Sequence, residues 1–371
     1  MAVMLGFHRE KRVDATTPFY LCELRIRLFD RIFCYDKFLS TYLGRPPRIS
    51  YRHCAMQSPL DLNDDEVCLE EPDLTAALSR LEGGWSTLGH TNRSSWRRVS
   101  SQQATICEDI LEISLGLYHE DLDGRIRQVR LKIESAREQL PAFVRVNPEE
   151  ILSNLHHSPA CMIPDRNVEW RPLDVIMLLM IHCGFRHTDF LLERAIVNRL
   201  RPSRTHFIVC ARSLLDIVLK GLSKREYLRD FQADIVALDK LAFYALPSAS
   251  FLAIELLRSD QTGNYDDALP RSKTVQQLST LISAFETVSP EEGNHRTCEV
   301  GRIAIQQVLD RLLSPHRPQQ TPDMTANSGV MLGCDTSFPH NNDADALQWL
   351  GNLDFDASDW ASFLQASEPF S

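Results

Sequence analysis

Apolar residues recur every three or four positions between Phe19 and Leu43. This spacing places them on one face of an α-helix, so it predicts an amphipathic helix over this range. Pro18 suits the start of that helix, because the first N–H groups of a helix have no partner within it. The predicted apolar face consists of Leu21, Leu24, Leu28, Ile32, Tyr35, Leu39 and Tyr42.

The motif Gly44-Arg45-Pro46-Pro47 ends this predicted helix. Glycine tolerates the left-handed conformation that caps many helices, and the prolines cannot continue the hydrogen-bond ladder. Residues 48–72, which follow, are predicted to form an extended loop. At minimum, the motif is therefore a helix terminator.

Helical patterns also cover most of the chain as far as residue 313. We find no alternating pattern typical of strands and no repeat of fixed period. Residues 82–95 are rich in Gly and Ser and predict a surface loop, and Pro247 predicts a kink or break. These patterns predict an all-α fold, an irregular multi-helix bundle. The further predicted helices cover residues 73–81, about 100–139 with an interruption at 121–124, a short helix from 147, and about 172–199, 203–222, 228–258, 271–288 and 295–313.

The composition changes after Ser314, where Pro, Ser and Asn become frequent and the helical period is lost. We therefore predict a helical body over residues 1–317 and a disordered tail over residues 318–371. Aromatic and aliphatic residues alternate with acids near its end, which is typical of activation segments that dock into a partner's groove. The alternative is a terminal helix that packs back on the body. The predicted docking residues are Trp349, Leu350, Phe355, Trp360 and Phe363.

The formal net charge of −10 is unevenly distributed along the chain. No lysine or arginine follows Arg317, and the segment beyond it carries eight acidic residues. Residues 1–317 consequently hold 40 basic and 42 acidic residues. This near-neutral body does not favour direct DNA binding, which needs clustered basic residues to neutralise phosphates.

The ten cysteines include no Cys-x-x-Cys pair, and several fall within apolar helical patterns. This pattern predicts reduced, buried thiols in an intracellular protein. The apolar stretch at the N-terminus is too short for a signal peptide. The apolar run at residues 175–185 is shorter than the roughly 20 residues that span a bilayer. We therefore predict no association with a membrane.

Motifs for catalysis or metal binding are scarce. The sequence holds no phosphate-binding glycine loop, no Gly-x-Ser-x-Gly and no His-Glu-x-x-His. The clusters at residues 156–161 and 182–187 contain His and Cys without the paired spacing of a zinc site. The acids at residues 61–65 lack the alternating ligands of a calcium loop and predict a solvated turn. We therefore expect no enzyme activity, no cofactor and no metal in this chain.

The segment from Gly6 to Asp61 resembles the regulatory middle homology region, the fungal-specific transcription factor domain, of fungal zinc-cluster transcription factors. It combines Gly-Phe-His-Arg, a helix with arginines and aromatics, and Leu-Gly-Arg-Pro-Pro, whereas the family often has tryptophan at the position of Cys34. Residues 206–219 and 243–257 resemble weaker helices further along that region. The matching residues are Gly6, Phe7, His8, Arg9, Glu23, Arg25, Arg27, Phe29, Phe33, Asp36, Ser40, Leu43, Gly44, Arg45, Pro46, Pro47, Ile49, Ser50, Pro59 and Asp61.

The resemblance implies an all-α regulatory domain in the nucleus that controls transcription by RNA polymerase II, such as that of a metabolic gene cluster. The implied partners are coactivators or mediator-type proteins, and a homodimer or heterodimer is compatible with it. Family members also carry a six-cysteine cluster that binds two zinc ions and DNA, and no cysteine here matches it. DNA contact would therefore require an upstream cluster or a partner. The match begins part-way through the family's region, so we expect an N-terminally incomplete domain or a regulator without its own DNA-binding module.

In this interpretation Asp36 and the Gly44–Pro47 turn are structural. Arg45 is expected to bridge helix ends or an acid such as Asp61, with the prolines fixing the direction of the chain. The alternative function is that of a helical small-molecule-binding protein or enzyme with no DNA role.

Overall fold

The computed structural model describes residues 6–9, 17–117, 121–154, 161–162, 169–224, 235–291 and 295–314. These residues form an all-α fold, as predicted, and they also include two short antiparallel strand pairs, which were not predicted. The elements in chain order are α1 (Phe19–Leu43), η1 (Tyr51–His53), α2 (Asp64–Val67), α3 (Asp73–Ser79), β1 (Leu81–Glu82), β2 (Trp85–Ser86), α4 (Arg93–Leu115), α5 (Leu122–Glu138), α6 (Pro148–Asn154), β3 (Cys161–Met162), β4 (Glu169–Trp170), α7 (Pro172–Leu200), α8 (Thr205–Leu222), α10 (Ile235–Thr262), α11 (Arg271–Phe285) and α12 (His295–Leu313).

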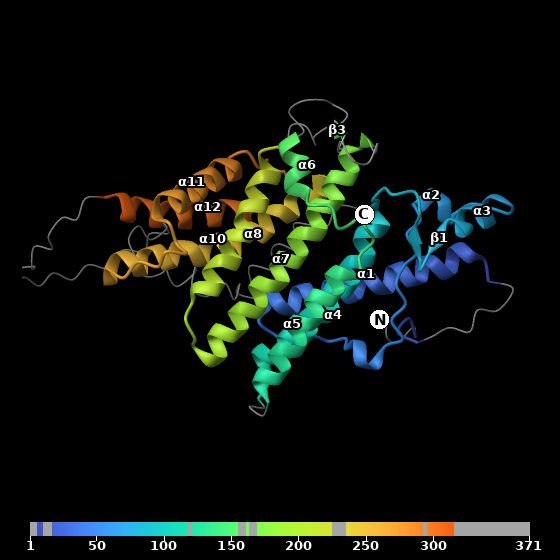
Figure 1. Ribbon diagram of the computed structural model, residues 1–371, viewed down its shortest axis with the longest axis horizontal. Coiled ribbons are helices and arrows are strands. Elements are labelled where there is room, and N and C mark those ends of the chain that lie inside the picture. Colours follow the sequence, from blue (N-terminus) through green and yellow to red (C-terminus); the bar gives the residue numbers. More distant parts are fainter. Residues whose placement is uncertain are drawn as a thin grey trace, which may run out of the picture.

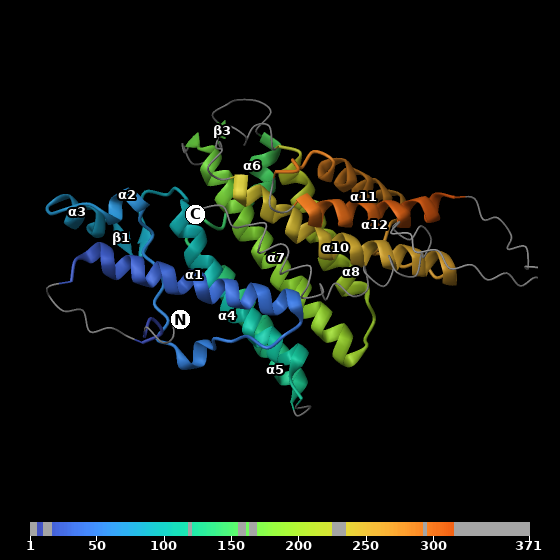
Figure 2. The ribbon, with the colours of Figure 1, turned by 180° about the vertical axis from the view of Figure 1, so that it is seen from behind.

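Helix α7 is the centre of the bundle. It packs against α4 on one side and against α8 and α10 on the other. Figures 1 and 2 show α1 crossing α4 at one end of the molecule, with α11 and α12 beside α10 at the opposite end. One continuous core joins α4, α5, α6, α7, α8, α10, α11 and α12, and a small second cluster is formed by Leu62, Val67 of α2 and Ala77 of α3.

The apolar composition of α7 explains this central position. By length and composition the helix could cross a membrane, although the apolar run read from the sequence at residues 175–185 is shorter. However, 78% of its most apolar window is buried inside the fold. A helix that is apolar nearly all round finds this cover only in the middle of a bundle.

The predicted surface loop at residues 82–95 is wrong in part, because it holds two short strands and the first residues of α4, and the predicted start of that helix near residue 100 is wrong. Gly83 and Gly84 have φ angles of 58° and 79° and join β1 to β2 in a tight hairpin, which needs positive φ in its turn. Helix α4 then begins at Arg93, because the Asn92 side chain accepts hydrogen bonds from the N–H groups of Ser94 and Ser95.

Two other local predictions also need correction. The loop at residues 48–72 contains η1 and α2, so it is not extended throughout. Helix α10 continues through Pro247, so the predicted break is absent, whereas the alternative of a kink stays a prediction. The predicted tail, its five docking residues and its boundary at residue 317 lie outside the described residues, so these remain predictions.

Gly184, in the middle of α7, permits close packing of this helix on α4. A Cβ atom at this position would lie 2.3 Å from Gln103 Oε1, and Gln103 Nε2 donates to the Ile181 carbonyl oxygen at 3.0 Å. We expect Gly184→Val to lower the free energy of unfolding by about 2 kcal/mol, through overpacking and loss of that hydrogen bond. Urea denaturation measures the loss.

The matched control is the same substitution in a Gln103→Ala background, where the obstructing amide is absent. There the cost of Gly184→Val should fall below about 1 kcal/mol. An equal cost in both backgrounds would contradict the role assigned to Gly184.

Candidate functional site

Helix α1 begins and ends at the predicted residues. Gly44 takes the left-handed conformation, with φ 60° and ψ 31°, and the Arg45 N–H donates to the Ser40 carbonyl oxygen at 3.0 Å. This six-residue ring is a common helix terminus. The chain therefore turns back along α1 immediately after the helix ends.

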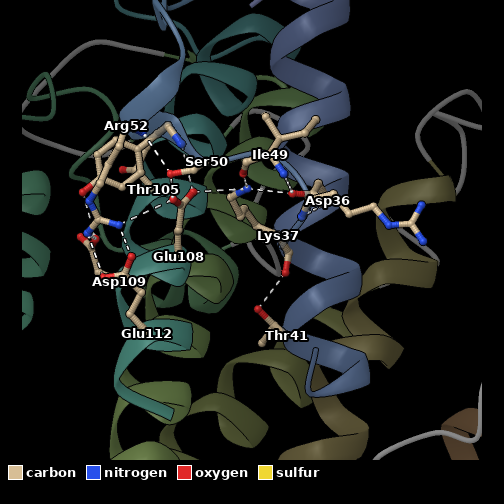
Figure 3. Close-up of polar contacts among 12 residues, drawn as sticks. Asp36, Lys37, Thr41, Ile49, Ser50, Arg52, Thr105, Glu108, Asp109 and Glu112 are labelled. Atoms are coloured by element: carbon tan, nitrogen blue, oxygen red, sulfur yellow. Dashed lines mark hydrogen bonds and ion pairs between the residues drawn. The ribbon is translucent and has the colours of Figure 1, made fainter. Parts of the chain in front are cut away.

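Asp36 holds the segment that returns along α1 after the turn, residues 48–53, which we call the returning segment (Figure 3). Its Oδ1 accepts a hydrogen bond from the Arg48 N–H, and its Oδ2 accepts one from the Ile49 N–H, both at 3.0 Å. The same carboxylate forms an ion pair with Lys37, with 2.8 Å between Oδ2 and Nζ. Asp36 thus fixes the direction of the chain after the Gly44–Pro47 turn.

Lys37 is buried, although lysine is rarely found inside proteins without a partner. Its ammonium donates to Asp36 and to the Ile49 carbonyl oxygen, and lies 3.3 Å from Glu108 Oε2 on α4. The ammonium also lies 4.2 Å from the centre of the Phe33 ring. Three acceptors and an aromatic face compensate the desolvation of this charge.

Glu108 is the matching buried acid, with an exposed fraction of 2%. In addition to Lys37, it accepts hydrogen bonds from the Ser50 hydroxyl at 2.6 Å and from the Tyr51 N–H at 3.2 Å. One carboxylate therefore joins α1, the returning segment and α4. We call Asp36, Lys37 and Glu108 the buried clamp.

The polar contacts continue outward from the buried clamp to the surface. Arg52 contacts Asp109 and Glu112, which follow Glu108 on α4, and Lys132 of α5 lies 2.6 Å from Asp109. Burial and a hydrogen bond to Asp109 raise the pKa of Tyr51 to about 12. Arg52 and Glu112 are each nearly half exposed, so the network changes from buried to solvated across one helical turn.

A second buried set of charges fixes the other end of α1. Arg27 donates to Glu23 at 2.9 Å, to Asp64 at 2.6 Å and to the Leu62 carbonyl oxygen at 2.8 Å. Glu23 also accepts a hydrogen bond from the Leu60 N–H at 2.9 Å. The chain at residues 60–64 is therefore held against α1 by side chains of α1 itself.

The expected bridge between Arg45 and Asp61 is not formed. The Arg45 side chain is exposed, whereas Asp61 is buried and accepts hydrogen bonds from the Ser95 hydroxyl at 2.6 Å and the Ser86 N–H at 3.0 Å. Burial raises the pKa of Asp61. The predicted solvated acidic turn is therefore also wrong at this residue, because neighbouring donors allow it to enter the interior.

The apolar face of α1 does not face the core as the pattern suggested. Among its residues Leu21, Leu24, Leu28 and Tyr35 are each about half exposed. The opposite face is buried, and it combines Phe29 and Phe33 with paired charges. This orientation follows from the partners of those charges on α4 and in the segment 60–64. The buried charged residues of α1 are Glu23, Arg27, Asp30 and Lys37.

Sequence reasoning identified Asp36 and the turn but missed the burial of Lys37 and its pairing with Glu108 on α4. The available signal was a second face of α1, since Glu23, Arg27, Asp30, Phe33 and Lys37 also follow helical spacing. Glu108 gave no comparable signal, because Asp109 is a second acid between Ile106 and Ile110.

The buried clamp can position helices, because each of its charges is already paired with another group. Within the described ranges no group of three or more His, Cys, Asp or Glu side chains could hold a metal ion. His182 is an interior histidine whose pKa burial lowers to about 4.

Comparisons with known proteins give no further assignment: no family model, no curated protein and no solved structure matches this chain.

Proposed function

We propose that this chain is a transcriptional regulator of fungal type, with a helical regulatory body and an acidic activation tail. In this proposal the body, residues 1–317, controls the activity of the tail, residues 318–371, in the nucleus. The tail recruits coactivators or mediator-type proteins to genes transcribed by RNA polymerase II. Contact with DNA is made through an upstream zinc cluster or a partner protein.

The observation that supports this proposal is the position of the residues on which the resemblance rests. Arg25 donates to the Gly6 carbonyl oxygen at 2.6 Å, and its guanidinium carbon lies 4.9 Å from the centre of the Phe7 ring. The His8 carbonyl oxygen accepts a hydrogen bond from the Ala55 N–H at 2.9 Å. The Gly-Phe-His segment is thereby joined to both α1 and the returning chain.

The other matching residues belong to the same framework. Three of them lie on α1 and form hydrogen bonds with residues 49–62, which follow that helix: Glu23, Arg27 and Asp36. A fourth, Ser50, donates a hydrogen bond to Glu108 of α4. Residues that match a family pattern and also contact one another favour a shared fold over a chance similarity. This is the reason to prefer the regulatory function that the pattern implies.

The test is a reporter experiment with the full chain fused to a heterologous DNA-binding domain. Substitution of Trp349, Phe355, Trp360 and Phe363 by Ala should lower reporter expression more than about tenfold, because aromatic anchors dominate such interfaces. Quantitative reporter assays at equal protein level measure the effect.

The matched control replaces four apolar residues elsewhere in the tail, Met324, Val330, Met331 and Leu332, by Ala. This variant should retain its activity, because these residues lie outside the alternating acidic and aromatic segment. A wild-type fusion that is silent, or an equal loss in both variants, would refute the proposed activation segment.

The alternative is a helical small-molecule-binding protein or enzyme without a role in transcription. The observation that favours it is a partly open cavity whose wall includes Lys37 of the buried clamp. A silent fusion combined with ligand binding in that cavity would favour this alternative.

A further inference from the structure

A cavity of about 140 Å³ lies between α1, α4, α7 and α10. Its lining is mostly apolar and includes four aromatic side chains, Tyr35, Phe38, Trp96 and Tyr244. An apolar cavity of about 150 Å³ in another protein is known to bind benzene. The volume thus suits a molecule built around one aromatic ring.

The wall of this cavity carries no acidic residue, whereas Arg31, Lys37 and Arg194 all contribute to it. The charge of Lys37 is balanced by Asp36 and Glu108. Arg31 differs, because among the described residues it forms no ion pair, and its guanidinium carbon lies 4.7 Å from the Trp96 ring and 5.4 Å from the Tyr35 ring.

Arg31 is half-buried and lies beside Tyr35, which also lines the cavity and is 49% exposed. Guanidinium groups bind carboxylates through paired hydrogen bonds. A ligand with its ring among the aromatic side chains could therefore place a carboxylate at Arg31.

The remaining polar groups of the wall are compatible with such a ligand. Burial lowers the pKa of His187 to about 3, so this imidazole is neutral at physiological pH. Burial also raises the pKa of Cys107 to about 12, and its thiol stays protonated. His187 and Cys107 are only half-buried by surface exposure, because part of each faces the cavity.

We propose that this cavity binds a small aromatic carboxylate, with Arg31 as the recognition residue for its charge. The ligand would contact α1, α4, α7 and α10 together and stabilise their packing. The inference goes beyond the proposed role in transcription and does not depend on it. If both are correct, the ligand is a chemical input to the regulatory body.

Three probes of similar shape test the proposal on the full chain: benzoate, benzyl alcohol and benzylamine. Titration calorimetry should show saturable binding of benzoate, weaker binding of benzyl alcohol and no binding of benzylamine. Thermal unfolding should show the same order, because ligands that bind the native state raise its melting temperature. Equal shifts with all three probes, or no binding of benzoate at millimolar concentration, would overturn the proposal.

Variants identify the site. Arg31→Gln should weaken benzoate binding about tenfold and leave benzyl alcohol binding unchanged, because only the carboxylate uses the charge. Arg45→Gln, an exposed arginine outside the cavity wall, should have no effect. Ala104→Leu fills the cavity and should abolish binding while unfolding stays cooperative. Unchanged benzoate affinity in Arg31→Gln would refute the assignment of that residue, and the probe series tests the cavity even if Ala104→Leu does not fold.

Discussion

Replacing Glu108 with alanine is expected to lower the free energy of unfolding by about 3 to 5 kcal/mol. The substitution leaves the buried ammonium of Lys37 without its partner on α4, and removes the acceptor of the Ser50 hydroxyl and the Tyr51 N–H. Unsatisfied buried donors keep their full cost of desolvation. Urea denaturation of the full chain, with far-UV circular dichroism as the signal, measures the loss.

Glu112→Ala is the matched control, because this glutamate lies one turn further along α4 and also contacts Arg52. It is 45% exposed, so its loss should cost less than about 1 kcal/mol. Arg45→Ala should likewise have little effect, since that side chain is exposed. If Glu108→Ala costs no more than these controls, the buried clamp does not stabilise the fold.

A double variant separates the charge pair from the packing around it. Lys37→Met combined with Glu108→Leu removes both charges and keeps apolar volume. Replacement of a buried ion pair by apolar residues is often neutral or stabilising, so the double variant should recover much of the stability that Glu108→Ala loses. A double variant as unstable as Glu108→Ala would place the cost in lost hydrogen bonds to Ser50 and Tyr51.

The location of the helices was predictable because local signals determine it. The spacing from Phe19 to Leu43 and the cap at Gly44 predicted both ends of α1, and the helical pattern at about 172–199 predicted the range of α7. Such signals depend on residues within a few positions of one another. They were sufficient for the fold class and for most of the helices.

The orientation of α1 was not predictable from the same signals. A stripe of leucines usually faces the core, but here Lys37 and Arg27 face it, since their partners Glu108 and Leu62 lie far along the chain. A single sequence does not reveal which distant acid meets which base. The partner of Arg45 was predicted wrongly for the same reason.

The candidate site was predicted only in part. The reason is again the distance along the chain between the residues that interact. Asp36 was identified through the pattern on which the resemblance rests, whose residues lie close together in the sequence. Glu108 was missed, because its role depends on α4 packing against α1. The cavity was missed as well, since it is formed by side chains of four helices.

Replacing Asp30 on α1 with asparagine gives the second large effect on stability. Unlike Glu108→Ala, this substitution should raise the free energy of unfolding. The Asp30 carboxylate is 3% exposed, and its Oδ1 accepts no hydrogen bond from the residues that the structure describes. Burial raises the pKa of Asp30 to about 6, and Ser101, Arg31 and Arg97 offset only part of that cost. The native state therefore binds this proton more tightly than the unfolded chain, whose aspartate has a pKa near 3.8.

The difference between the pKa of Asp30 in the folded and unfolded states determines how stability changes with pH. Between pH 3.8 and pH 6 the folded state carries more protons at Asp30 than the unfolded state, so this residue's contribution to stability falls as the pH rises. Above pH 6 the ionised Asp30 carboxylate lowers the free energy of unfolding by about 3 kcal/mol relative to its value below pH 3.8. The two pKa values differ by about 2 pH units, and each pH unit corresponds to about 1.4 kcal/mol. The neutral histidines His182 and His187 act in the opposite direction, because acid protonates them in the unfolded chain first.

Asp30→Asn should therefore stabilise the protein by about 2 to 3 kcal/mol at pH 7.5 and have little effect at pH 4. Subtracting the wild-type curve removes the contribution of the histidines, which both proteins share. Urea denaturation at each pH from 4 to 8 measures the difference, with the exposed Asp267→Asn as the control that should show none. A difference that stays constant with pH, or an asparagine variant less stable than the wild type at pH 7.5, would show that Asp30 is held in its charged form by interactions stronger than its burial.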